Sequence, residues 1–138
     1  MTAALRLPQA RRFRGRPSIR LGALCAAALA RAALAAAHLP DGVHRLGGAL
    51  ADASGKPLYI WDHDTMAGMS HCESDCAQMW PPLKASAGAK PTGDWTLVTR
   101  EDGSKQWAYK TKPLYTYSAD RPGQAPAGES IPNWHLAR

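Results

Sequence analysis

The sequence has no apolar run of the roughly 20 residues that a transmembrane helix needs, which excludes a polytopic membrane protein. Acidic residues are absent before Asp41, whereas seven of the 17 Lys and Arg residues lie there. From His38 onward, 10 basic residues stand against 11 acidic ones, so this part has a net charge near −1. Since nucleic-acid binding needs a folded surface rich in Lys and Arg, we expect no nucleic-acid partner.

The N-terminal region carries the basic surplus and has the pattern of an export signal. A basic stretch reaches Arg20, an apolar stretch runs from Leu21 to Ala30, and small residues follow at 35–37. We therefore predict a signal peptide over 1–37 and a single domain over 38–138, located in the periplasm or outside the cell. Cys25 follows Leu24 rather than a small residue, so we expect no lipid anchor.

Cysteine is scarce: removal of the leader leaves only Cys72 and Cys76. In an oxidising compartment such a pair is expected to form a disulfide. A loop this short contributes only about 2 kcal/mol on the chain-entropy model, so its role is to shape one turn.

Aliphatic residues are also few, and Phe is absent after residue 38, which alone would suggest disorder. Five Trp and four Tyr compensate, because each large ring can bury about 150–250 Å². We predict an aromatic core.

One segment is repeated at an offset of 56 residues. Lys-Pro-Leu-Tyr-Ile-Trp at 56–61, followed by Asp64, matches Lys-Pro-Leu-Tyr-Thr-Tyr at 112–117, followed by Asp120. Alternation within each copy predicts a strand, with Leu58 and Ile60 on one face of the first strand and Tyr59 and Trp61 on the other. Turn residues at 52–55, 101–104 and 110–112 predict antiparallel hairpins, with further strands near 48–51, 96–100 and 105–109.

A single short helix is expected from Ser70, where Ser70 and Glu73 have the spacing of a capping box, to Trp80, where two prolines follow. The predicted fold is thus mainly β: a small antiparallel β domain with two pseudo-repeated halves and one short helix.

These motifs resemble a family of exported bacterial proteins, often lipoproteins, known by a repeated Tyr-x-aromatic-x-x-Asp motif and called a secreted repeat of unknown function. The matching residues, from about Gly48 to the C-terminus, are the two motifs and the Trp that follows each: Tyr59, Trp61, Asp64, Trp80, Tyr115, Tyr117, Asp120 and Trp134. The resemblance implies the location and the fold, and it brings no activity or ligand.

Three function classes remain open. The first is a non-catalytic binding or interaction module, which we expect to be monomeric and to have an unknown envelope component as its partner. Its motif aromatics and carboxylates suit either a structural role or, as an alternative, a glycan ligand. The two carboxylates fall short of the six to eight oxygens that calcium takes.

Copper handling is the second class, because soft or borderline ligands gather at His63, Met66, Met69 and His71, next to the two cysteines. Otherwise no cofactor is expected. An enzyme is the third class and is disfavoured, since no nucleophile, orienting base and oxyanion site occur together.

Overall fold

The computed structural model describes residues 38–138, so the predicted signal peptide lies outside the described residues. Seven short strands, one α-helix and one 3₁₀-helix follow in chain order: β1 (Val43–Leu46), β2 (Ala49–Asp52), β3 (Tyr59–Trp61), α2 (Asp75–Met79), β4 (Trp95–Thr99), β5 (Lys105–Tyr109), β6 (Lys112–Pro113), η1 (Ala127–Ser130) and β7 (Trp134–Leu136). Within this region no helix has the length and apolar character of a membrane span.

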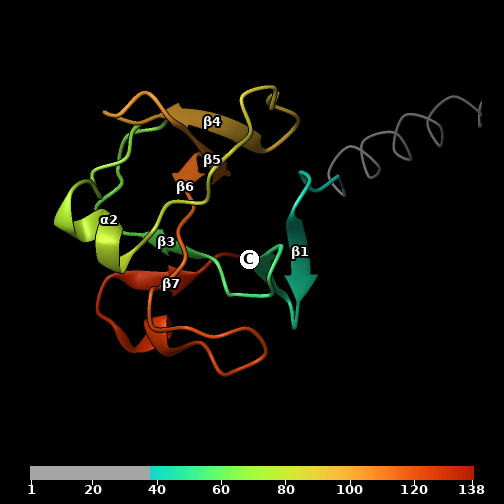
Figure 1. Cartoon of the computed structure of the whole chain (residues 1–138), viewed down its shortest axis with the longest axis vertical. Helices are drawn as coiled ribbons and strands as arrows, with labels where there is room; N and C mark the ends of the chain where they lie inside the picture. The colour runs from blue at the N-terminus through green and yellow to red at the C-terminus, as the bar shows by residue number, and fades with distance from the viewer. Residues whose placement is uncertain (1–37) are drawn as a thin grey trace, which may run out of the picture.

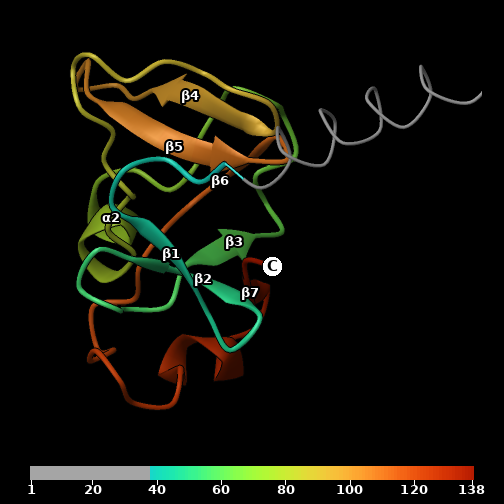
Figure 2. The ribbon, with the colours of Figure 1, turned by 90° about the vertical axis from the view of Figure 1, so that its right-hand side faces the viewer.

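The strands form three small antiparallel sheets, β1-β2, β3-β7 and β4-β5-β6. Figures 1 and 2 show the three-stranded sheet at one end of the molecule, the β3-β7 pair in the middle and η1 at the other end. The prediction of a mainly antiparallel β fold with two related halves is confirmed.

Two of the three predicted turns join the expected strands, whereas the turn at 52–55 is followed only by an isolated bridge, Ala51↔Pro57, because β2 pairs with β1 and β3 pairs with β7. The turn at 101–104 pairs Thr99 of β4 with Lys105 of β5, and Gly103 takes a φ of 80°, which an L side chain rarely adopts. Lys110 and Thr111 form the tight turn into β6, with φ angles of 49° and 69°. The meander from 95 to 113 therefore follows the sequence pattern.

Two strands have no counterpart in the prediction. β1 pairs with β2, and β7 pairs with β3 at Tyr59↔Leu136 and Trp61↔Trp134. β7 has only three residues, too few to show a period of two, and its partner lies more than 70 residues away along the chain. Sequence alternation gives no signal for such a pairing.

The second copy of the motif is less regular than predicted. Residues 114–117 form no continuous strand, and Tyr115 makes only isolated bridges, to Tyr59 and to Pro82. Since Pro82 has no N–H to donate, the ladder opposite Tyr115 cannot continue. Backbone bonds on either side, Leu83 N–H to the Leu114 oxygen (2.8 Å) and Thr116 N–H to the Pro81 oxygen (2.9 Å), still hold this segment in place.

The predicted helix was too long. α2 begins after Ser74, whose φ of 51° is not helical, so the helix cannot include Cys72. Ser74 makes no side-chain cap. The predicted capping box is wrong, because Ser70 and Glu73 bond to Tyr115 and Arg100 instead. With Cys72 outside the helix, the disulfide does not have to fit helical geometry.

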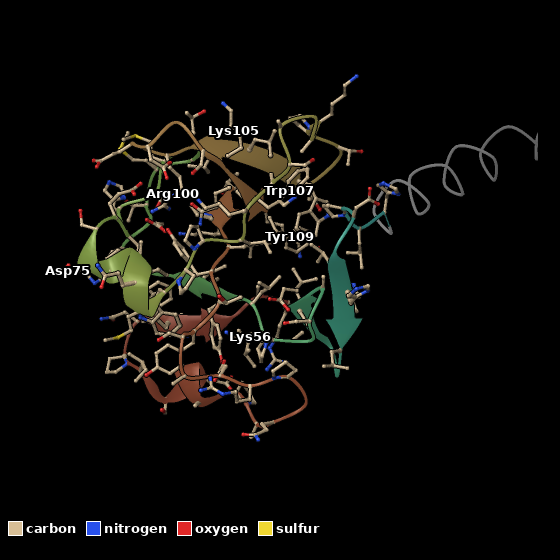
Figure 3. The ribbon with its side chains drawn as sticks, viewed as in Figure 1. Lys56, Asp75, Arg100, Lys105, Trp107 and Tyr109 are labelled. Atoms are coloured by element: carbon tan, nitrogen blue, oxygen red, sulfur yellow. A yellow bond between two sulfur atoms is a disulfide. The ribbon has the colours of Figure 1, made fainter. Side chains whose placement is uncertain are left out.

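Alternation along the first motif correctly separates two hydrophobic clusters. Leu58 and Ile60 face a cluster with Trp95, Trp107 and Tyr109. Figure 3 shows Trp107 and Tyr109 on the side of the three-stranded sheet. Tyr59 and Trp61 face the other cluster, built from the remaining rings of both halves: Trp80, Tyr115, Tyr117 and Trp134.

The two halves exchange their final segments. The first motif strand pairs with β7, at the end of the second repeat. The second motif segment pairs instead with residues 81–83, at the end of the first repeat. The hairpins repeat this exchange, since Leu50 N–H bonds to the Ala137 oxygen (2.8 Å) and Trp107 N–H to the Leu83 oxygen (2.9 Å). Each repeat thus completes the sheet of the other.

Gly128, on η1, packs tightly against the rings of Tyr59 and Trp80. A Cβ at this position would lie 2.8 Å from Cζ of Tyr59 and 2.9 Å from Cη2 of Trp80, closer than packed atoms approach. Gly128→Ala is therefore expected to destabilise the fold by about 1–3 kcal/mol through overpacking, measured by urea unfolding. Gly88→Ala is the matched control, since its Cβ would meet nothing within 4 Å. Equal stabilities of the two variants would contradict this packing.

Candidate functional site

The repeated tyrosines and aspartates bond across the repeats. The Tyr59 hydroxyl donates to Oδ2 of Asp120 (2.6 Å), and the Tyr115 hydroxyl donates to Oδ2 of Asp64 (2.5 Å). Between them, Tyr59 and Tyr115 exchange two backbone bonds, of 2.8 and 3.0 Å. All four residues are at most 2% exposed. Each motif is therefore completed by the carboxylate of the other motif.

The second oxygen of each carboxylate is also engaged, in matching ways. Oδ1 of Asp64 accepts the His71 backbone N–H at 2.8 Å, and Oδ1 of Asp120 accepts the Ala127 N–H at 2.9 Å. His71 and Ala127 are themselves 56 residues apart, so the local loop geometry repeats with the sequence. Both carboxylates are held by hydrogen bonds within the protein, which is the structural role weighed for the motif.

The tyrosine hydroxyls are kept neutral by their surroundings. Burial, followed by the hydrogen bond and the negative charge of Asp120, raises the pKa of Tyr59 above its ordinary value. Burial and the hydrogen bond to Asp64 raise the pKa of Tyr115 in the same direction. A neutral hydroxyl is required here, because a phenolate cannot donate to a carboxylate.

Rings from both halves form a stacked column. Trp80 and Trp134 lie parallel at the centre, with ring centroids 3.7 Å apart and an interplanar angle of 4°. Trp61 stacks on Trp134 at 5.2 Å, and Tyr117 lies against Trp80 at 4.5 Å. Trp61 and Tyr117 are only half-buried, so both ends of the column reach the surface.

A buried cation that the sequence did not reveal holds the segment before α2. Arg100 is 5% exposed, and its guanidinium donates to Oε2 of Glu73 (2.5 Å), Oε1 of Gln106 (2.8 Å) and the backbone oxygen of Cys72 (2.7 Å). Figure 3 shows Arg100 between the three-stranded sheet and the α2 segment. Arg100 follows β4 with no motif around it, and only its tertiary partners identify its role.

The structure joins Cys72 and Cys76 by a disulfide, with Cα atoms 5.1 Å apart. Cys72 is fully buried in the aromatic cluster, whereas Cys76 is partly buried on α2. The crosslink and Arg100 both hold the segment before α2, so this turn is fixed on two sides.

The four soft or borderline ligands predicted for copper have different surroundings in the fold. His63 lies against Trp61, with ring centroids 4.9 Å apart. His71 turns to Asp64 instead, with Nδ1 3.3 Å from Oδ1. Met66 and Met69 lie between them in an exposed loop and are 55% and 46% exposed. Among residues 38–138, no three His, Cys, Asp or Glu side chains gather closely enough to hold a metal ion.

The fold and the crossed motif define a class of protein: a duplicated β repeat whose two copies complete each other through exchanged strands and exchanged Tyr–Asp bonds. The chain belongs to the family described as a secreted repeat of unknown function, whose model matches it twice, over residues 43–84 and 96–138. The family predicted from the motifs is thus confirmed, and with it an exported location. No match was found among curated proteins or among solved structures.

Proposed function

We propose that this chain is an exported, non-catalytic binding module whose ligand-bearing element is the loop from Asp62 to His71. The observation that carries the proposal is a difference in exposure between the motif residues and this loop. The motif carboxylates and tyrosines are buried and bonded to one another, while the loop between Asp64 and His71 exposes two methionines. An exposed pair of large apolar side chains on a fixed loop suits contact with a ligand.

The hydrogen bonds made by the polar side chains support the proposal of a non-catalytic module. Ser70 lies next to His71 in sequence, but its Oγ bonds to the Tyr115 hydroxyl (2.7 Å) and accepts from Arg100 (3.0 Å). The Ser70 hydroxyl therefore bonds to Tyr115 and Arg100 and not to a general base. Every buried side-chain nitrogen or oxygen in the described part of the chain also has a hydrogen-bond partner.

The proposed setting is the periplasm or the cell exterior, where the module acts as a monomer towards an envelope component. The disulfide of Cys72 and Cys76 supports an oxidising compartment. Of the two ligand classes weighed from the sequence, a glycan has less support, because Trp61 and Tyr117 each use a ring face in the stacked column. Copper has more support, because a buried carboxylate orients His71.

The test is oxidation footprinting with hydrogen peroxide, which converts exposed methionine to the sulfoxide. Met66 and Met69 are expected to be oxidised several-fold more slowly in the intact envelope than in the purified protein, because a ligand covers them. Met79, which is 53% exposed on α2, is the internal control and should react equally in both samples. After reduction, cleavage before aspartate separates residues 64–74 from residues 75–93, so the two regions are read independently by mass spectrometry. Equal oxidation of Met66 and Met69 in the two samples contradicts the proposal.

A further inference from the structure

The loop that carries Met66 and Met69 is anchored to the core at both ends. At its base, Asp64 Oδ1 accepts the His71 N–H (2.8 Å), and Asp64 Oδ2 accepts the buried Tyr115 hydroxyl (2.5 Å). Lys112 donates from Nζ to the Asp64 backbone oxygen (2.8 Å). Within the loop, Met69 N–H bonds to the Met66 oxygen (3.3 Å), which brings the two backbones into one turn. The methionines therefore project from a closed loop with a fixed base.

The ring of His71 is oriented by the same carboxylate. Its Nδ1 lies 3.3 Å from Oδ1 of Asp64, and a carboxylate only accepts hydrogen bonds, so Nδ1 carries the proton. In the neutral imidazole, Nε2 then has its lone pair free. The His71 side chain is 42% exposed, while that of Asp64 is fully buried. A carboxylate behind a histidine is the usual outer-sphere arrangement of a metal ligand, because it fixes the tautomer and the orientation of the ring.

The composition of the loop selects the kind of ion. Among residues 38–138, no three His, Cys, Asp or Glu side chains gather closely enough to hold a metal ion, whereas this loop carries two thioethers, Met66 and Met69, close to His71 in sequence. Thioethers are soft ligands that favour Cu(I). They also need no deprotonation and form no disulfide, so they remain ligands in an oxidising compartment where Cys72 and Cys76 are joined.

We propose that Met66, Met69 and Nε2 of His71 bind one Cu(I) ion, with Asp64 as the outer-sphere partner of His71. The inference rests on the proposed role of this loop and names its ligand. Three neutral ligands leave the ion with its single positive charge at the protein surface. The loop then couples this surface ion to the buried Tyr115–Asp64 bond of the scaffold.

The test is anaerobic titration of the purified exported protein with Cu(I) against a chromophoric Cu(I) chelator. We expect one tightly bound Cu(I) per chain. Met66→Leu combined with Met69→Leu should weaken binding at least 100-fold, and His71→Ala should weaken it at least tenfold. Both methionines are exposed, and leucine has a similar volume, so the double variant is expected to fold normally. Met79→Leu removes an equally exposed thioether elsewhere and should leave the affinity unchanged.

The possible results separate this proposal from the broader one. Wild-type Cu(I) affinity in the double methionine variant, or no stoichiometric Cu(I) binding by the wild-type protein, overturns the copper site. If Met66 and Met69 are nevertheless protected from peroxide in the envelope, the loop binds another ligand and its proposed role as a binding element stands. If Cu(I) does not bind and there is no protection either, both proposals are wrong.

Discussion

Asp120→Ala is expected to lower the free energy of unfolding by about 2–5 kcal/mol. The substitution leaves two donors without their acceptor, the buried Tyr59 hydroxyl and the Ala127 N–H. The orphaned buried Tyr59 hydroxyl costs about 1–3 kcal/mol, because it has lost water without gaining a partner, and the lost hydrogen bond of the part-buried Ala127 N–H to a charged group adds about 1–2 kcal/mol. Urea unfolding followed by tryptophan fluorescence measures the loss, with the denaturant slope checked for two-state behaviour.

Asp102→Ala is the control for this experiment. Like Asp120, Asp102 accepts two hydrogen bonds, here from the N–H and the hydroxyl of Ser104. Asp102, however, lies on the exposed turn between β4 and β5. Water can replace those bonds, so its loss should be much smaller. If the two variants lose the same stability, the buried Tyr59–Asp120 bond does not have the structural role given to it.

Alkaline pH is expected to unfold the protein cooperatively as Tyr59 and Tyr115 are forced to ionise. In the unfolded chain a tyrosine has a pKa of about 10, whereas burial and the carboxylate partners raise the pKa of both tyrosines in the folded state. The stabilisation is therefore fully present below about pH 10 and is lost as the pH rises beyond it. Each tyrosine contributes a slope of about 1.4 kcal/mol per pH unit, so the two together remove about 2.8 kcal/mol per pH unit.

The measurement is the free energy of unfolding between pH 9 and 12, alongside the Tyr115→Phe variant. Phenylalanine does not ionise, so the variant should lose less stability per pH unit than the wild-type protein, by about half of the two-tyrosine slope. It also starts from a lower stability at pH 9, since the bond to Asp64 is gone. Identical slopes would show that Tyr115 does not control the alkaline transition.

The sequence was most informative where the pattern is local. Alternation in the first motif separates Leu58 from Tyr59, and the two residues lie in different clusters as predicted. Gly103 marks the β4–β5 turn because that position requires a positive φ. The aromatic core was likewise predicted by counting rings. These features depend on neighbouring residues, so a single sequence contains them.

What the sequence did not reveal depends on distant partners. The motif places Tyr59 and Asp64 together, yet Tyr59 bonds to Asp120, 61 residues away. The roles of Arg100 and β7 have the same origin, since their partners lie on other elements. The helix was overestimated because Ser70 and Glu73 fit a cap by spacing, whereas the buried Arg100 offers Glu73 a stronger, charged partner.

The exchange of hydrogen bonds between repeats is most directly tested by a double-mutant cycle with Tyr59→Phe and Asp120→Asn, set beside one with Tyr59→Phe and Asp64→Asn. The first pair is bonded at 2.6 Å across the repeats, so a coupling energy of about 1 kcal/mol or more is predicted. The second pair belongs to one motif but shares no hydrogen bond, and its effects should add. Coupling of Tyr59 to Asp64 together with additivity between Tyr59 and Asp120 would contradict the exchanged scaffold from which the exposed loop projects.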